Sequence, residues 1–212
     1  MGYKVIDLQT SDEECKLDTG LSVSEKKLES SKYVVEINNN GDICSIVDKE
    51  LSTDIIRKPI KFEMNKYSGS KIFPAWELRY KEIDAEPIEY AANGICTVEE
   101  NGPARVTVKV QQTAGKSSFT YYVSLTAGCP WISVYNEVEW REFRRALHNG
   151  FYFNVKSSFA TYDLGLGTIK RPKANKKMYS VPAQKWVDIT DADSSKGVSI
   201  FSDSKYGWMM QD

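Results

Sequence analysis

Apolar and polar residues alternate along much of the chain, which is the pattern of a β-strand with one buried face. Near the start, Tyr33, Val35 and Ile37 occupy one face of such a segment. The run Asn39-Asn40-Gly41-Asp42 follows, and Asn-Gly accepts the positive φ angles of a tight hairpin turn. Residues 43–47 are again apolar, so we expect strands at 32–38 and 43–47 that pair as a hairpin.

The same alternation predicts longer strands at residues 88–98, 105–111, 119–125 and 131–140. Turns rich in Gly and Pro separate them, at 101–103 and 127–130. Shorter strands are expected at 151–155, 159–162, 168–170, 185–189 and 198–202, and an exposed loop at 171–177. Only residues 141–147 have a spacing compatible with one or two helical turns. Many short strands with such turns indicate an all-β sandwich.

Two segments at the ends of the chain differ from this pattern. Residues 7–29 are polar, so we interpret residues 1–28 as an N-terminal strand and linker, and residues 29–212 as the β-sandwich domain. The last residues include Trp208, Met209 and Met210, whereas natural termini are usually polar. We therefore expect a domain truncated at its C-terminus, incomplete at a sheet edge and prone to self-association through that open edge.

Charge and cysteine usage exclude several classes of protein. With 28 basic and 29 acidic residues the net charge is -1, which argues against nucleic acid as a partner. No apolar run reaches the roughly 20 residues of a membrane helix, so no membrane partner is expected. The four cysteines are far apart and form no C-x-x-C pair, which excludes a zinc ribbon and favours reduced cysteines in a cytoplasmic protein, with two disulfides as the alternative.

The sequence offers little for catalysis. His148 is the only histidine, so neither a zinc site nor a Ser-His-Asp triad has its usual residues, and we expect His148 in a loop. Gly165-Leu166-Gly167 lacks the third glycine of a dinucleotide-binding loop. Glu137 and Glu139 share a strand face, but the alternation directs both to solvent rather than into a pair for glycosidic hydrolysis. We expect no catalytic residue, no metal ligand and no cofactor in this chain.

Aromatic residues are the remaining candidates for binding. Trp76, Trp131 and Trp186 would bind sugar rings if they formed an exposed row, or they fill the space between two sheets. Arg171 precedes Pro172 after a strand, where its guanidinium would reach a sugar hydroxyl, a neighbouring domain or a structural ion-pair partner. Arg171, Trp76 and Trp186 are the candidate substrate-binding residues.

Several motifs, taken in order, resemble one family. The run Leu28–Glu50 resembles the opening of the C-terminal β-domain of glycoside hydrolase family 38 α-mannosidases, and Gly2–Val5 looks like the last strand of the region before it. Later stretches are similar to the family in the same order: Pro74–Leu78, Cys129–Glu142, Tyr162–Pro172, Val181–Thr190 and Gly197–Trp208. The resemblance therefore covers nearly the whole chain.

The resemblance implies an antiparallel supersandwich of the galactose-mutarotase kind. It also implies a parent enzyme that hydrolyses α-mannosides with retention, using zinc and carboxylates of an α/β catalytic domain that precedes this one. No position here matches those motifs, so we expect a non-catalytic part that packs on the catalytic domain of the same polypeptide, near a mannose-containing carbohydrate. The alternatives are a carbohydrate-binding module, a structural interaction domain or a sugar mutarotase, for which His148 alone supplies too little acid-base chemistry.

Overall fold

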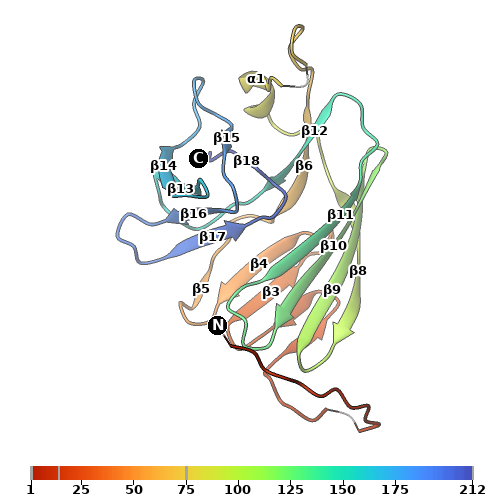
Figure 1. Ribbon diagram of the computed structural model, residues 1–212. Helices are drawn as coiled ribbons and strands as arrows, with labels where there is room; N and C mark the ends of the chain where they lie inside the picture. Colours follow the sequence, from red (N-terminus) through yellow and green to blue (C-terminus); the bar gives the residue numbers. More distant parts are fainter. Residues whose placement is uncertain (1, 14, 75, 212) are drawn as a thin grey trace.

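The computed structural model describes residues 2–13, 15–74 and 76–211. Over these residues the strands form antiparallel sheets, and the only helix is the four-residue α1 (Tyr80–Ile83). Figure 1 shows a sandwich of two sheets with a second group of strands beside it. The prediction of an all-β, antiparallel fold is confirmed.

Two sheets enclose the main core. The first has the order β1 (Ser22–Ser24), β2 (Lys27–Glu29), β3 (Tyr33–Ile37), β4 (Ile43–Asp48) and β5 (Thr53–Asp54). The second has the order β11 (Ser133–Glu139), β10 (Ser117–Thr126), β9 (Arg105–Ala114) and β8 (Ala92–Asn101). The inward residues of both sheets meet in one buried cluster, formed by Leu28, Val35, Ile37, Ile43, Ile46, Ile56, Val106, Val108, Val110, Tyr121, Val123 and Leu125. The predicted hairpins of these sheets are confirmed.

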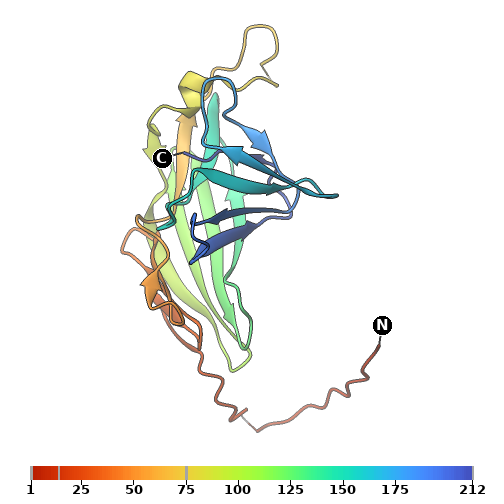
Figure 2. The same cartoon turned by 90° about the vertical axis from the view of Figure 1, so that its left-hand side faces the viewer.

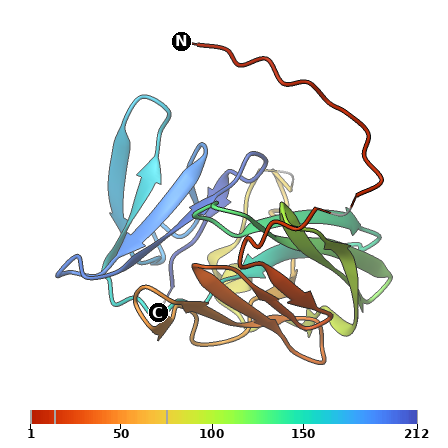
Figure 3. The same ribbon diagram turned by 90° about the horizontal axis from the view of Figure 1, so that it is seen from below.

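The remaining strands form a third sheet and a C-terminal group. The third sheet has the order β12 (Arg145–Gly150), β6 (Lys61–Lys66) and β7 (Glu89–Tyr90). The C-terminal group contains β14 (Thr168–Pro172), β13 (Phe159–Asp163), β16 (Trp186–Thr190) and β17 (Gly197–Phe201), and the pair β15 (Val181–Pro182) and β18 (Gly207–Trp208). This group has its own buried cluster around Tyr162, Val181 and Val187. Figure 3 shows it next to the sandwich rather than stacked on it.

Three local predictions were wrong. Residues 145–147 belong to strand β12, not to a helical turn, because they pair with β6 from Arg145↔Lys66 to Gly150↔Lys61. Residues 151–155 form no strand and contribute only the bridge Ile56↔Phe153. Arg171 and Pro172 end strand β14 rather than begin a loop. For β12, pairing with a strand about eighty residues earlier overrides the local pattern, while Arg171 and Pro172 extend β14 because they pair with Ala160 and Phe159 of the preceding strand.

The N-terminal region runs away from the sheets. Residues 2–13 and 15–21 contain no strand, including at Gly2–Val5, and Figure 2 shows an extended arm that leads to the sandwich. Strand β1 and the first two residues of β2 lie within the segment interpreted as a linker. The sandwich therefore takes in residues from Ser22 onward, and the predicted boundary at 28/29 falls inside β2.

Buried hydrogen bonds connect the two sheets of the sandwich. The turn between β3 and β4 carries Asn40 and Asp42, and the Nε2 of Gln112 on β9 donates to the Asn40 carbonyl at 2.7 Å and to the Asp42 carboxylate at 3.1 Å. The Tyr121 hydroxyl on β10 donates to the Gly41 carbonyl. Asp42 and Gln112 are only 2% and 3% exposed, so these bonds are shielded from water.

Strand β8 closes over the same turn. The Asn93 amide donates to the Asn40 side chain at 3.3 Å, and Gly94 follows it. A Cβ atom at Gly94 would lie 2.4 Å from the Asn40 carbonyl oxygen and 2.5 Å from Gly41 Cα. Since both of these neighbouring atoms belong to the backbone, only glycine allows β8 to approach the turn between β3 and β4 this closely.

The substitution Gly94→Ala tests this close approach. We expect it to lower the free energy of unfolding by about 2–3 kcal/mol, because the backbones must separate and weaken the buried bonds. Urea denaturation of both proteins measures the difference. The matched control is Gly167→Ala, since a Cβ at Gly167 meets nothing within 4 Å. Equal stability of the two variants would contradict the close contact.

Candidate functional site

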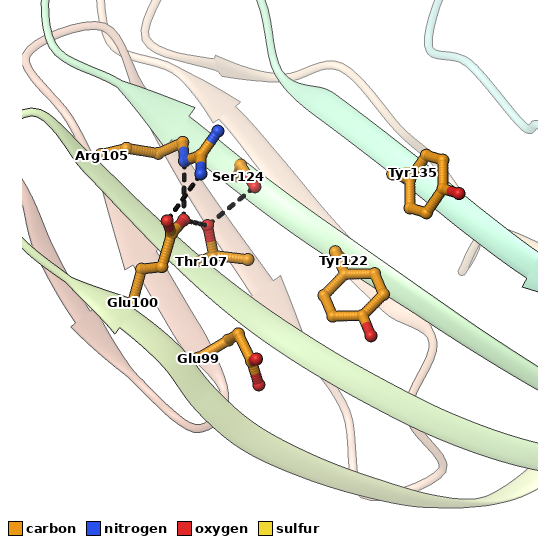
Figure 4. Close-up of a pocket in the computed structure, with 7 residues that line it drawn as sticks. All are labelled: Glu99, Glu100, Arg105, Thr107, Tyr122, Ser124 and Tyr135. Atoms are coloured by element: carbon orange, nitrogen blue, oxygen red, sulfur yellow. Dashed lines mark hydrogen bonds and ion pairs between the residues drawn. The ribbon is translucent and has the colours of Figure 1, made fainter.

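A shallow groove crosses the outer face of the second sheet. Its volume is about 370 Å³, and Figure 4 shows the side chains that line it: Glu99, Glu100, Arg105, Thr107, Tyr122, Ser124 and Tyr135. They come from β8, β9, β10 and β11. The groove follows from the alternation, because Val106 and Val108 point into the core while Thr107 points outward.

The polar groups at one end of the groove bind one another. The Arg105 guanidinium donates two hydrogen bonds of 2.6 Å to the Glu100 carboxylate. The Thr107 hydroxyl also donates to Glu100 and lies 2.9 Å from the Ser124 hydroxyl. The bonds from Arg105, and then from Thr107, lower the pKa of Glu100 to about 2. Glu100 is therefore ionised at neutral pH and is poorly suited to donate a proton to a leaving group.

Aromatic rings form the other end. The rings of Tyr122 and Tyr135, which are register partners on β10 and β11, have centroids 6.1 Å apart. The Lys109 ammonium lies 5.9 Å from the centroid of Tyr122, and Tyr135 is 64% exposed. Exposed ring faces beside carboxylates and hydroxyls can stack on and hydrogen-bond to a polar ligand such as a sugar. Sequence reasoning missed this groove, although the outward positions of the predicted strands contained the signal.

The tryptophan candidates lie apart from the groove and from one another. Trp76 is 83% exposed in the connection between β6 and α1, and Trp131 is 60% exposed in the turn before β11. Trp186 is partly buried on β16, where it pairs with Phe201. Of the two alternatives, one exposed row is not formed, because the three side chains lie on separate elements. Trp76 and Trp131 do not fill the space between the sheets either, because both are exposed.

Arg171 has a structural setting within the C-terminal group. Its guanidinium lies 5.3 Å from the centroid of the Tyr162 ring on β13 and donates to the Pro182 carbonyl on β15 at 2.9 Å. These contacts tie β13, β14 and β15 together. Among the described residues, the guanidinium is thus engaged by a cation–π contact and a backbone hydrogen bond.

His148 lies in strand β12 rather than in a loop, which corrects the expectation. Its register partner is Glu63 on β6. Burial lowers the pKa of His148, and the nearby Glu63 carboxylate offsets part of this effect.

Glu137 and Glu139, the two acids expected at the surface, lie there, since Glu137 is exposed and Glu139 pairs with Arg141.

The side chains that could bind a metal ion do not form a metal centre in the part of the chain that the structure describes. Among residues 2–13, 15–74 and 76–211, no three side chains of the His, Cys, Asp or Glu type gather in a way that would hold an ion. A zinc ion therefore finds no set of ligands in these segments.

None of the described helices is long and apolar enough to cross a membrane.

Comparison with known proteins gives a consistent result. Residues 28–212 match the family described as glycosyl hydrolases family 38 C-terminal domain. Mouse alpha-mannosidase 2C1 is 27% identical over 139 residues, covering 63% of this chain and 13% of the mouse protein. Alpha-mannosidase G of Dictyostelium discoideum is 24% identical over 187 residues, covering 82% of this chain and 17% of that protein.

Solved structures show the same fold. A glycosyl hydrolase family 38 protein from Enterococcus faecalis superposes with a TM-score of 0.72 at 16% identity, covering 87% of this chain and 25% of its own. An alpha-mannosidase from Enterococcus faecalis V583 gives 0.71 at 16% identity, covering 87% and 24%. The chain thus spans less than a fifth of the curated relatives and about a quarter of the solved ones.

The lowered pKa of His148 predicts how stability depends on pH. Since the folded-state pKa lies below the unfolded value of about 6.5, the unfolded chain takes up this proton first as the pH falls. We expect stability to decrease as the pH falls from about 7 through 6.5, until the folded-state pKa is passed. Urea denaturation at several pH values between 7 and 5 measures this decrease.

The variant His148→Gln is the comparison. It should lose less stability over the same interval, because its side chain takes up no proton. Carboxylates with lowered pKa values, such as Glu29 and Glu100, titrate below the ordinary glutamate value of 4.5 and so lie outside this pH interval. The same pH dependence in both proteins would contradict the burial of His148.

Proposed function

The chain belongs to the glycosyl hydrolase family 38 C-terminal domain family, and we propose that it is the non-catalytic β-domain of an α-mannosidase, packing on the catalytic domain of the same polypeptide. The observation that carries the proposal is the family match over residues 28–212, nearly the whole chain. The relatives named above are α-mannosidases several times longer than this chain, so their length leaves room for a separate catalytic domain.

The chemistry of the described residues supports a non-catalytic role. Glu100 is held as an ion by Arg105, and the described segments gather no metal-binding cluster. In the proposed enzyme, hydrolysis of terminal α-mannosides with retention, and the zinc ion that the family implies, belong to the catalytic domain. The β-domain contributes its rigid surface, which shapes or supports the substrate cleft.

A cytoplasmic location is part of the proposal. The four cysteines are free thiols, as expected in a reducing compartment. Burial raises the pKa of both Cys44 and Cys96, which disfavours the reactive thiolate form.

A complementation experiment tests the main proposal. The catalytic region of the α-mannosidase that contains this domain is produced as a separate polypeptide and mixed with the present chain. We expect the mixture to hydrolyse a nitrophenyl α-mannoside faster, or to unfold at a higher temperature, than the catalytic region alone, because binding to the folded state stabilises it. An unrelated β-sandwich protein is the control. No change in rate or melting temperature would refute the proposal, and so would turnover by the present chain alone.

The groove favours carbohydrate binding as a second candidate function. Tyr135 presents an exposed ring on β11, next to its register partner Tyr122, while Glu99 lies on β8 at the opposite side of the groove. If the groove binds mannosides, titration with methyl α-mannoside should shift the NMR signals of Tyr122 and Tyr135 saturably at millimolar concentration. Tyr135→Ala should abolish these shifts, while Tyr206→Ala, another exposed tyrosine, should leave them unchanged. Unchanged spectra of the wild-type chain would exclude this function.

A further inference from the structure

The connection between β6 and α1 exposes an unusual amount of apolar surface. Ile72 is 77% exposed, Phe73 47% and Trp76 83%. The rings of Phe73 and Trp76 stack on each other in parallel, with centroids 5.6 Å apart and an angle of 3° between their planes. We call this pair the aromatic hook. Large exposed rings gathered in one place are typical of a surface that is covered by a partner.

The backbone that carries the hook is held by local hydrogen bonds. The Ser70 hydroxyl accepts bonds from the amides of Ile72 at 3.1 Å and Phe73 at 2.7 Å. The Phe73 carbonyl accepts bonds from the amides of Trp76 and Glu77, both at 3.1 Å. The backbone that carries the rings is thus ordered before any partner binds, which reduces the entropy lost on association.

The base of the connection is equally constrained. The Tyr67 hydroxyl donates to the Pro74 carbonyl, and the Ser68 amide donates to the Glu82 carboxylate of α1 at 2.9 Å. Gly69 has a φ of +63°, and a Cβ there would lie 2.9 Å from the Pro74 carbonyl oxygen. The connection folds back on itself and projects as a unit beyond β6 and α1, as Figure 1 shows.

Other aromatic residues extend the exposed surface at this end. Phe143, in the connection between β11 and β12, is 81% exposed, and the neighbouring Arg144 accepts a backbone bond of 3.0 Å from Tyr67. From the C-terminal group, Tyr179 packs on Tyr80 and donates to the Leu78 carbonyl at 2.7 Å. The residues on either side of the hook are therefore contacted from both parts of the molecule.

We propose that the aromatic hook is the docking element through which this domain binds its catalytic domain, with Trp76 seated in an apolar pocket of that partner. The proposal rests on the proposed function. The size of the relatives supports this partner, since the chain accounts for only 13% to 17% of the curated α-mannosidases. The remainder of such a polypeptide supplies the covering surface.

The shape of the hook argues against a second copy of the chain as the partner. A two-fold contact would place one protruding hook against another, or against a pocket of the other copy. The outer groove is lined mainly by polar and charged residues, and so is a second hollow, formed by Thr53, Arg57, Phe153, Asn154, Val155, Lys156 and Lys196. Neither of these offers an apolar seat for two stacked rings.

The test measures the dissociation constant between this chain and the separately produced catalytic region by biolayer interferometry. We expect Trp76→Ala to weaken binding about 10-fold or more, because a central buried aromatic carries much of an interface's affinity. The melting temperature of the variant should match that of the wild type, since Trp76 is 83% exposed.

The matched control is Trp131→Ala. Trp131 is also an exposed tryptophan, at 60%. Trp131 precedes β11, whereas Phe143, which lies at the same end as the hook, follows that strand. Trp131 therefore lies at the opposite end of the sheet from the hook. Its loss should change the dissociation constant less than about 2-fold.

The outcomes separate the two proposals. If the wild type binds and Trp76→Ala binds equally well, the hook is not the docking element, while the proposed function stands. If the wild type does not bind, the proposed function fails and the hook loses its partner. Sedimentation of the chain alone as a dimer that Trp76→Ala dissociates would instead identify a second copy as the occupant and overturn the inference.

Discussion

The sandwich depends on the buried hydrogen bonds between the Asn38–Asp42 turn and the second sheet. Gln112 and Tyr121 supply donors to this turn from two neighbouring strands, and Asn40 returns a contact to β8. Apolar packing between two sheets is not directional, so it leaves their relative position loosely defined. Buried polar groups must instead find particular partners, since an unpaired one is costly in a dry interior. This contact fixes one sheet against the other.

Once the sheets are fixed, the two faces of each strand have separate roles. The inward face of β9 and β10 fills the core, and the outward face forms the polar groove with Glu100, Arg105 and Tyr135. Strand β11 lies at the edge of its sheet with every residue exposed, including the inward-facing Val134 and Val138. Such an edge is available for pairing, so self-association through it stays a prediction. An uncovered inward face also fits a domain that buries surface against a larger protein.

Local pattern was sufficient for the longer strands that pair with a neighbour in sequence. The hairpins of β3 with β4, of β8 with β9 and of β10 with β11 follow from alternation and from turn residues. It failed where the partner is distant: β6 pairs with β12 across about eighty residues, and neither strand was recognised. His148 was consequently expected in a loop. Strands of two or three residues, such as β1, β5 and β15, contain too few positions to show a period at all.

The all-β class, the main hairpins, the lack of a usual catalytic histidine set and the family could be predicted from the amino-acid sequence, because these depend on residue types and on short spacings. Which side chains meet could be known only from the three-dimensional fold. Arg171 binds Tyr162 and Pro182, the three tryptophans lie on separate elements, and Trp76 stacks with Phe73 on a projecting connection. The outer groove likewise needs the register of four strands at once. Alternation gives each residue a face, but contacts between segments far apart in sequence are set by packing of the whole sandwich.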